Sequence, residues 1–446
     1  MRLVTSLLVI ASLAACDSDG GGLTGPQAGS AACENDGQKQ FVLDNLYAWY
    51  LWNDLLPPDL SIDDYTSAEQ LVSEVTLTYG PQKPNNGGPI DLFSSVGSAQ
   101  ADAAFFGEGQ YGGFGFSYRF VDTDDARLSR VFSGSPAALG GLERGQRILG
   151  LNGRTIAEIN ANEGVSAALA GETVAFEMRR PDGSEFIVSI TRGTVTIDPV
   201  PRTRIIDRGP GVPPAGYVEL ASFISTADPV FDTVFADFIA AGVTDVIIDL
   251  RYNSGGLVST ARLLGDYLGA FANDGRVASQ TQFNADRAAA NNSTEFFARQ
   301  GNSINLSKLV VIATNATASA SELVTNSLEA YFDVGIVGDN TFGKPVGQIG
   351  LTFCEKILRP TSFQLVNALG EGDYFDGLPA DCAAPDDLNT MPGDDADPNI
   401  VAALSYLNSG ACPVAAAPAG QFKAESGFSY RPELRGPAHR EFADAF

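Results

Sequence analysis

Residues 243–256 read VTDVIIDLRYNSGG, an apolar run that enters a polar turn ending in two glycines. A short apolar run bounded by turn residues is typical of a buried β-strand. The next stretch, LVSTARLLGDYLGAF at 257–271, has apolar residues at helical spacing, so we expect a helix directly after the turn. A strand, a glycine turn and a helix in this order indicate a βαβ unit and hence a parallel sheet.

The alternation of strands and helices continues on both sides of this stretch. We expect further strands at 216–223 and 308–315, a helix at 318–332, and a strand with its turn at 334–344. This order predicts an α/β layered core, which we assign to residues 197–410. In such sheets, functional residues gather where strands end and helices begin.

The remaining chain divides into a helical and a β-rich region. Residues 33–106 are expected to be mostly helical, because the stretch 41–57 has helical periodicity and ends at a proline pair. Residues 107–196 contain several short strand patterns separated by turns. Residues 411–446 are rich in Ala, Pro and Gly and indicate a loosely ordered tail. The fold class is therefore α/β and multidomain.

The N-terminus is typical of an exported protein. A basic Arg2 precedes the apolar residues 3–13, and the sequence Leu-Ala-Ala-Cys then ends at Cys16. This pattern resembles a bacterial lipobox, which implies that residues 1–15 are a signal peptide, that Cys16 is lipidated and that residues 16–32 form a flexible tether. It further implies a lipid anchor in the bacterial cell envelope, facing the periplasm or the exterior. The alternative is a plain signal peptide with a chance cysteine.

The charge balance excludes one class of partner. The chain has 54 acidic and 28 basic residues, a formal net charge of −26. Such a chain repels phosphate backbones, so we expect no nucleic-acid partner.

Four further cysteines permit two disulfides in an exported protein. These are Cys33, Cys354, Cys382 and Cys412. We predict a Cys354–Cys382 pair, because both residues lie in the same late segment. Nothing resembles a CxxC metal motif, so no zinc site is expected.

The histidine content excludes the commonest hydrolytic machinery. His439 is the single histidine and lies in the predicted tail, which argues against a Ser-His-Asp triad, a Cys-His nucleophile or a His-ligated metal.

The remaining candidate is a serine activated by a lysine. Ser319 lies where a predicted buried strand meets a helix N-terminus, whose N–H groups favour negative charge. Lys344 follows a later buried strand, and a lysine in an apolar pocket can lose its charge. However, the Ser319–Glu322 spacing equally fits a helix capping box.

The stretch 107–196 resembles a PDZ domain. Its glycine-rich segment YGGFGF at 111–116 is followed by GSPA at 134–137 and LNG at 151–153. PDZ domains add a peptide C-terminus as an extra strand. The resemblance implies peptide binding at Gly112, Gly113, Phe114, Gly115 and Phe116. The alternative is a structural β module that binds nothing.

Three motifs between residues 107 and 380 resemble the tail-specific, or C-terminal processing, serine peptidases. These are DLRYNSGG at 249–256, TASASELV at 317–324 and VGDNTFGKPVGQ at 337–348. The resemblance implies a crotonase-like core in which Ser319 is the nucleophile, Lys344 the general base and Gln348 its orienting partner. It also implies an oxyanion hole built by the glycine pair Gly255 and Gly256 together with Ala320. Pro345 departs from the family, which usually has glycine there.

The expected function is therefore cleavage of polypeptides with free C-termini through an acyl-enzyme, without cofactor, metal or nucleotide. Two alternatives stay open. One is a peptide-binding or scaffolding envelope lipoprotein with an inert peptidase-like core, and the other is a purely structural envelope lipoprotein.

Overall fold

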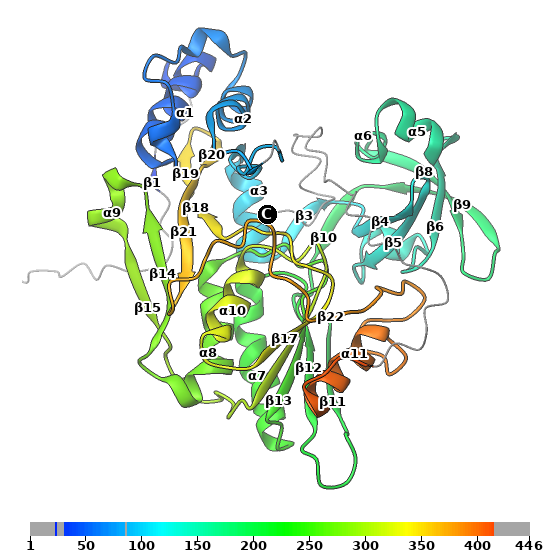
Figure 1. Cartoon of the computed structure of the whole chain (residues 1–446). Coiled ribbons are helices and arrows are strands. Elements are labelled where there is room, and N and C mark those ends of the chain that lie inside the picture. Colours follow the sequence, from blue (N-terminus) through cyan, green and yellow to red (C-terminus); the bar gives the residue numbers. More distant parts are fainter. Residues whose placement is uncertain (1–22, 25–30, 85–86, 414–446) are drawn as a thin grey trace, which may run out of the picture.

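The computed structural model describes residues 23–24, 31–84 and 87–413. The predicted signal peptide, Cys16, His439 and nearly all of the predicted tail lie outside this range. In Figure 1 the helical N-terminal region and the β-rich region lie above a larger α/β core. No helix in the described part of the chain has the length and apolar character needed to cross a membrane.

The α/β core is built on a six-stranded sheet with the order β11-β12-β13-β16-β17-β22. The strands from β12 to β22 are parallel, and β11 is an antiparallel edge. The strand bounds are Arg202–Ile206 for β11, Ala215–Glu219 for β12, Asp245–Asp249 for β13, Lys308–Ala313 for β16, Val334–Gly338 for β17 and Cys382–Ala383 for β22. The predicted strands and the largely parallel sheet are confirmed.

Helices cover both faces of this sheet (Figure 1). Because side chains alternate along a strand, Val246 and Ile248 face one layer while Ile247 faces the other. The bounds of the first layer are Asp228–Ala240 for α7, Val258–Asn273 for α8 and Ala320–Glu329 for α10; α11, on the other face, spans Pro398–Ser409. Burial on both faces explains why these strands are continuously apolar.

A second, antiparallel sheet flanks the core in the order β15-β14-β21-β18. Its strands span Val277–Phe283 (β14), Ser293–Phe296 (β15), Val346–Gln348 (β18) and Thr361–Asn367 (β21), and α9 spans Ala285–Asn291. Strand β18 begins two residues after Lys344, so this sheet fixes the chain that leaves the predicted general base.

The N-terminal unit combines helices with a hairpin from far along the chain. Helices α1 (Asn35–Trp49) and α2 (Ala68–Tyr79) pack on a sheet of order β1-β19-β20-β2, where β2 comes just before α3. The remaining bounds are Leu23–Thr24 for β1, Ser95–Ser98 for β2, Ala99–Ala103 for α3, Leu351–Phe353 for β19 and Lys356–Arg359 for β20. Residues 351–359, which we assigned to the α/β core from the sequence, thus form part of the N-terminal unit.

This hairpin overturns the predicted disulfide. Cys354 lies at the β19–β20 turn and bonds to Cys33, ahead of α1, with a Cα–Cα distance of 5.8 Å. Cys382, on β22, bonds to Cys412, beyond α11, at 5.3 Å. The Cys354–Cys382 prediction is wrong because proximity in sequence does not reflect the path of the chain: the hairpin carries Cys354 out of the core.

The β-rich module has its own hydrophobic core and a sheet of order β4-β5-β6-β8-β9. The bounds are Phe116–Asp122 for β4, Asp125–Val131 for β5, Arg147–Leu151 for β6, Arg154–Thr155 for β7, Thr173–Arg179 for β8 and Glu185–Thr191 for β9. Short helices α4 (Pro136–Leu139), α5 (Ile156–Asn162) and α6 (Val165–Ala168) complete it. A separate two-stranded antiparallel sheet pairs β3 (Gln110–Gly113) with β10 (Gly193–Thr196), just before and just after the module's larger sheet in the sequence.

Candidate active site

Ser319 lies at the carboxyl edge of the parallel sheet, between β16 and α10. Its backbone has φ 56° and ψ −114°, a region that side chains other than glycine rarely adopt. Holding such a conformation costs about 1–3 kcal/mol, and strain of this kind gathers at functional sites. Ser319 is half-buried, whereas Ala320 and the rest of the first turn of α10 are buried.

The loop before Ser319 is fixed against the glycine-rich turn that follows β13. The Ala318 N–H donates to the carbonyl of Asn253 at 3.1 Å, and the Ser321 hydroxyl donates to the same carbonyl at 2.9 Å. The hydroxyl of Thr317 donates to the Leu250 carbonyl at 2.8 Å. Two strand ends that are neighbours in the sheet therefore hold two of the predicted motifs together.

Glu322 joins Ser319 to the segment that carries Lys344. Its Oε2 accepts the N–H groups of Ser319 and Lys344, each at 2.8 Å, and its Oε1 accepts the Gly343 N–H at 2.7 Å and the Thr341 hydroxyl at 2.5 Å. The side chain is fully buried. Burial raises the pKa of Glu322 above its ordinary value, against the opposing effect of these hydrogen bonds. The capping-box spacing in the sequence thus has a second function, holding the Lys344 loop.

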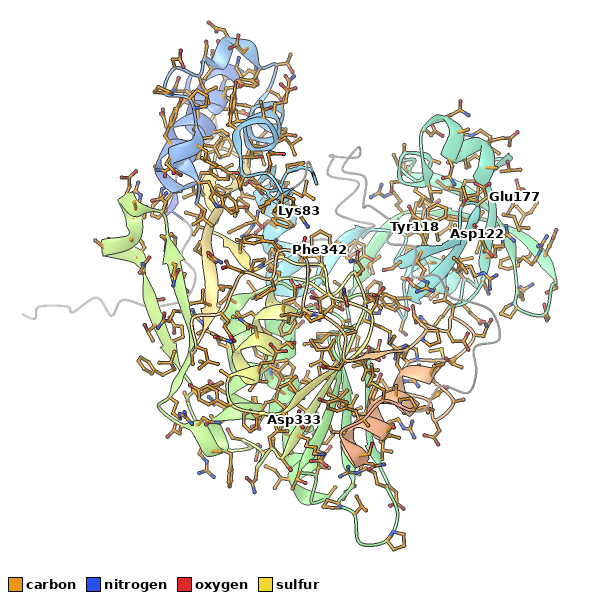
Figure 2. All side chains as sticks on the ribbon, viewed as in Figure 1. Lys83, Tyr118, Asp122, Glu177, Asp333 and Phe342 are labelled. Carbon is orange, nitrogen blue, oxygen red and sulfur yellow. A yellow bond between two sulfur atoms is a disulfide. The ribbon has the colours of Figure 1, made fainter. Side chains whose placement is uncertain are left out.

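Lys344 is 4% exposed and lies between Gln348 and an aromatic ring. Its Nζ donates to Gln348 Oε1 at 3.2 Å and lies 4.5 Å from the centre of the Phe93 ring. Phe342, labelled in Figure 2, lies two residues before Lys344. The rings of Phe342 and Phe93 pack edge to face, with their centres 6.0 Å apart. Gln348 contacts Lys344 as the family resemblance implied, whereas nothing in the sequence pointed to Phe93.

The glycine pair after β13 lies directly against the start of α10. Gly255 has φ +110°, and a Cβ built on it would come within 2.9 Å of Ser319 Cβ, the Ala318 carbonyl oxygen and the Ala320 nitrogen. Only glycine permits this approach. The Gly255 N–H already donates to Asn253 Oδ1 at 2.9 Å, so this donor is engaged within the turn. Ala320 is in the first turn of α10, where N–H groups have no intrahelical acceptor.

The β module contacts the same turn through two arginines. Arg144 donates to the Tyr252 hydroxyl at 2.9 Å, and Arg130 donates to Glu219 at 3.2 Å and lies over the Tyr252 ring. The Tyr252 hydroxyl also donates to Asp386. Burial alone would raise the pKa of Asp386, but neighbouring arginines, including Arg144, hold it below its ordinary value. The module is thus docked through charged groups on the turn that follows β13, a contact that the sequence did not indicate.

The predicted peptide-binding segment divides between two environments. Gly112 and Gly113 belong to β3, which pairs with β10, while the side chains of Phe114 and Phe116 are buried in the module's core. Their rings therefore pack the module, and any role in peptide binding falls to the backbone. Strand β4 is an edge of its sheet, and Tyr118 on it (Figure 2) lies 3.2 Å from Ser166 of α6.

Two family models match the chain. The model described as the peptidase family S41 matches residues 214–371, and that described as the peptidase S41 N-terminal domain matches residues 37–118. The first range contains Ser319, Lys344 and Gln348, and the second contains Phe93.

Curated relatives carry related names. The chain is 26% identical over 283 residues to the carboxy-terminal processing protease CtpA of Bacillus subtilis, covering 62% of this chain and 58% of the relative. It is 29% identical over 228 residues to the chloroplastic C-terminal processing peptidase of Tetradesmus obliquus, covering 47% and 46%. The chain thus spans about half the length of the curated relatives it matches.

Solved structures agree on the fold. A putative S41 protease from Bacteroides fragilis superposes with a TM-score of 0.64 and 25% identity, over 82% of this chain and 97% of the other. The photosystem II D1 C-terminal processing protease superposes with a TM-score of 0.52 and 19% identity, over 83% and 97%. The second likeness supports the fold alone.

Proposed function

Because this chain belongs to peptidase family S41, we propose that it is a serine endopeptidase in which Lys344 serves as the general base for Ser319. The observation that carries this proposal is the shared carboxylate of Glu322, which holds the strained Ser319 and the buried Lys344 to one atom. A capping box alone needs no contact with a distant loop, so the hydrogen bonds from Gly343 and Lys344 support an arrangement that holds the two segments together.

In the proposed reaction, neutral Lys344 accepts the proton of the Ser319 hydroxyl as Oγ attacks the scissile carbonyl carbon. The N–H groups of Gly256 and Ala320 stabilise the developing oxyanion. Collapse of the tetrahedral intermediate breaks the C–N bond, and the leaving amine takes the proton from Lys344. Water then attacks the ester, giving its proton to Lys344, and the new C-terminal carboxylate leaves as Ser319 regains its proton.

The β module is proposed to select substrates with a free C-terminus. The edge strand β4 supports this role, because an edge strand can accept a peptide as an additional strand. The docking of Arg144 on Tyr252 supports a short path from the module to the catalytic turn. We further propose that Cys16 carries a lipid that holds the enzyme at the bacterial envelope, where exported polypeptides are its substrates.

Incubation of the full chain, in mild detergent, with an unstructured polypeptide that ends in apolar residues tests the function. Ser319→Ala and Lys344→Ala are expected to abolish cleavage. Ser327→Ala, on the same helix, and Lys308→Ala, a lysine whose Nζ binds the Leu407 carbonyl, are matched controls that should remain active.

Amidation of the substrate C-terminus is expected to slow cleavage if the module captures free tails. Equal cleavage of free and amidated tails would remove the capture proposal and keep the peptidase. Tight binding of the free tail without Ser319-dependent cleavage would instead favour a peptide-binding scaffold with an inert core.

A further inference from the structure

A segment of the N-terminal unit reaches the candidate active site. Asp91 is fully buried and accepts hydrogen bonds from the N–H groups of Phe93 at 2.9 Å and Ser94 at 3.1 Å. It also accepts from the hydroxyl of Thr361 on β21 at 3.0 Å. These bonds fix the backbone of Phe93 against a strand of the flanking antiparallel sheet, so its position does not depend on its own side chain alone.

The carbonyl of Phe93 determines the orientation of Gln348. The Gln348 Nε2 donates to the carbonyls of Phe93 and Arg359, each at 2.8 Å. Carbonyl oxygens only accept hydrogen bonds, so the amide nitrogen must face them and Oε1 must face Lys344. A reversed amide would set its nitrogen against the Lys344 amine and its oxygen against two carbonyls.

The ring of Phe93 covers the other side of Lys344. At 4.5 Å from the ring centre, the amine is within the range of a cation–π contact, which favours the protonated ammonium. The ring also displaces water, which disfavours the ammonium. The same side chain therefore acts on the charge of Lys344 in two opposing ways, and substitutions can separate them.

We propose that Phe93 is a positioning residue for the reaction: it orients Gln348 through its carbonyl and sets the protonation balance of Lys344 through its ring. This inference rests on the proposed role of Lys344 as general base. It assigns the N-terminal unit a direct part in the active site.

The charged groups on the elements around Lys344 are engaged with other partners. Glu322 of α10 accepts four hydrogen bonds, including that from the Lys344 N–H. Arg359 of β20 forms a two-pronged ion pair with Asp102 at 2.5 and 2.6 Å, and Asp91 binds the groups given above. Substitution of the uncharged Phe93 leaves these pairs in place, so a change in pH dependence reports the ring.

The experiment measures kcat/KM against pH for the full chain and for Phe93→Leu, Phe93→Ala and Phe93→Tyr. Activity should rise on the acid side as Lys344 loses its proton. Leucine keeps an apolar cover but lacks the aromatic quadrupole, so the acid limb should move down by about half a pH unit or more. Alanine admits water and should move the limb up, and tyrosine should retain the original profile. Phe41→Leu, which removes an aromatic contact with Phe353 in the same unit, is the matched control and should not move the limb.

The outcomes separate this inference from the function on which it rests. If cleavage depends on Ser319 and the Phe93 variants lower it equally at every pH, as a folding defect would, the inference is wrong and the peptidase stands. If leucine and alanine move the acid limb in the same direction, the opposing roles of the ring are wrong. If no cleavage depends on Ser319, the proposed function itself fails.

Discussion

The backbone N–H groups of Ser319 and Lys344 donate to the same atom, Oε2 of Glu322, each at 2.8 Å. The two residues are 25 positions apart in the sequence. Ser319 lies between β16 and α10, whereas Lys344 lies on the connection from β17 of the parallel sheet to β18 of the antiparallel sheet. A shift of the Glu322 side chain would therefore displace the nucleophile and the proposed base together. This relationship makes Glu322 the most informative residue to change.

Glu322→Gln should reduce both stability and activity. Each carboxylate oxygen of Glu322 now accepts two hydrogen bonds. Glutamine replaces one of these oxygens by an NH₂ group, which only donates, so two buried N–H or O–H donors lose their acceptor. We expect a loss of about 2–4 kcal/mol in the free energy of unfolding and a fall of at least tenfold in kcat. Denaturant unfolding and steady-state kinetics measure the two effects. Retention of full activity with lowered stability would make Glu322 a structural cap only.

Gly255→Ala should remove activity and also lower stability. The new Cβ would press on the Ala320 nitrogen, one of the proposed oxyanion donors. Gly275→Ala is the matched control, because Gly275 also has a positive φ, at +74°, but open space around its Cα. Backbone strain should lower the stability of both variants by about 1 kcal/mol. Gly255→Ala should lose more, because its Cβ would also meet the Ala318 carbonyl oxygen and the Ala320 nitrogen. Only Gly255→Ala should lose about 100-fold or more in kcat. Equal activity of the two would argue against an oxyanion site here.

The two disulfides should differ in their effect. Cys33–Cys354 closes 321 residues and Cys382–Cys412 closes 30, so the first constrains the unfolded chain more. Replacing either pair by serines should cost about 2–5 kcal/mol, with the larger loss for the first pair. The first replacement should also lower kcat, because it loosens the unit that supplies Phe93. Thermal unfolding and kinetics on the two double variants provide the comparison, and a reversed order of the stability losses would contradict it.

Glu329→Gln should stabilise the protein at pH 8 and not at pH 4. Burial, followed by repulsion from Asp381 and Glu371, raises the pKa of Glu329 to about 7. The native state thus holds a proton that the unfolded state releases, so stability is highest below the unfolded pKa and declines as the pH rises toward 7. Glutamine resembles the protonated form and avoids this decline. We expect a gain of about 1–2 kcal/mol at pH 8 after allowance for partial exposure. Melting curves of both proteins across this range test it, and a constant difference would refute the titration.

The strands of the parallel sheet were predictable because burial on both faces leaves a continuous apolar run, as at Val246–Ile248. Helices α8 and α10 followed from periodicity, and the contact of Lys344 with Gln348 agrees with the spacing of a known motif. The β19–β20 hairpin was missed. Its strands are too short to give a clear pattern, and its partner β2 lies more than 250 residues away.

The α/β order of elements, the family motifs and the residue types of the candidate site could all be predicted from the sequence. Local periodicity and motif spacing depend on residues that are close in the sequence, so they can be recognised without knowledge of the fold. Three contacts required the folded structure: the bond between Cys33 and Cys354, the Phe93 ring over Lys344, and Arg144 on Tyr252. Each of these contacts joins residues more than 100 positions apart, and it forms because burial of distant surfaces brings them together.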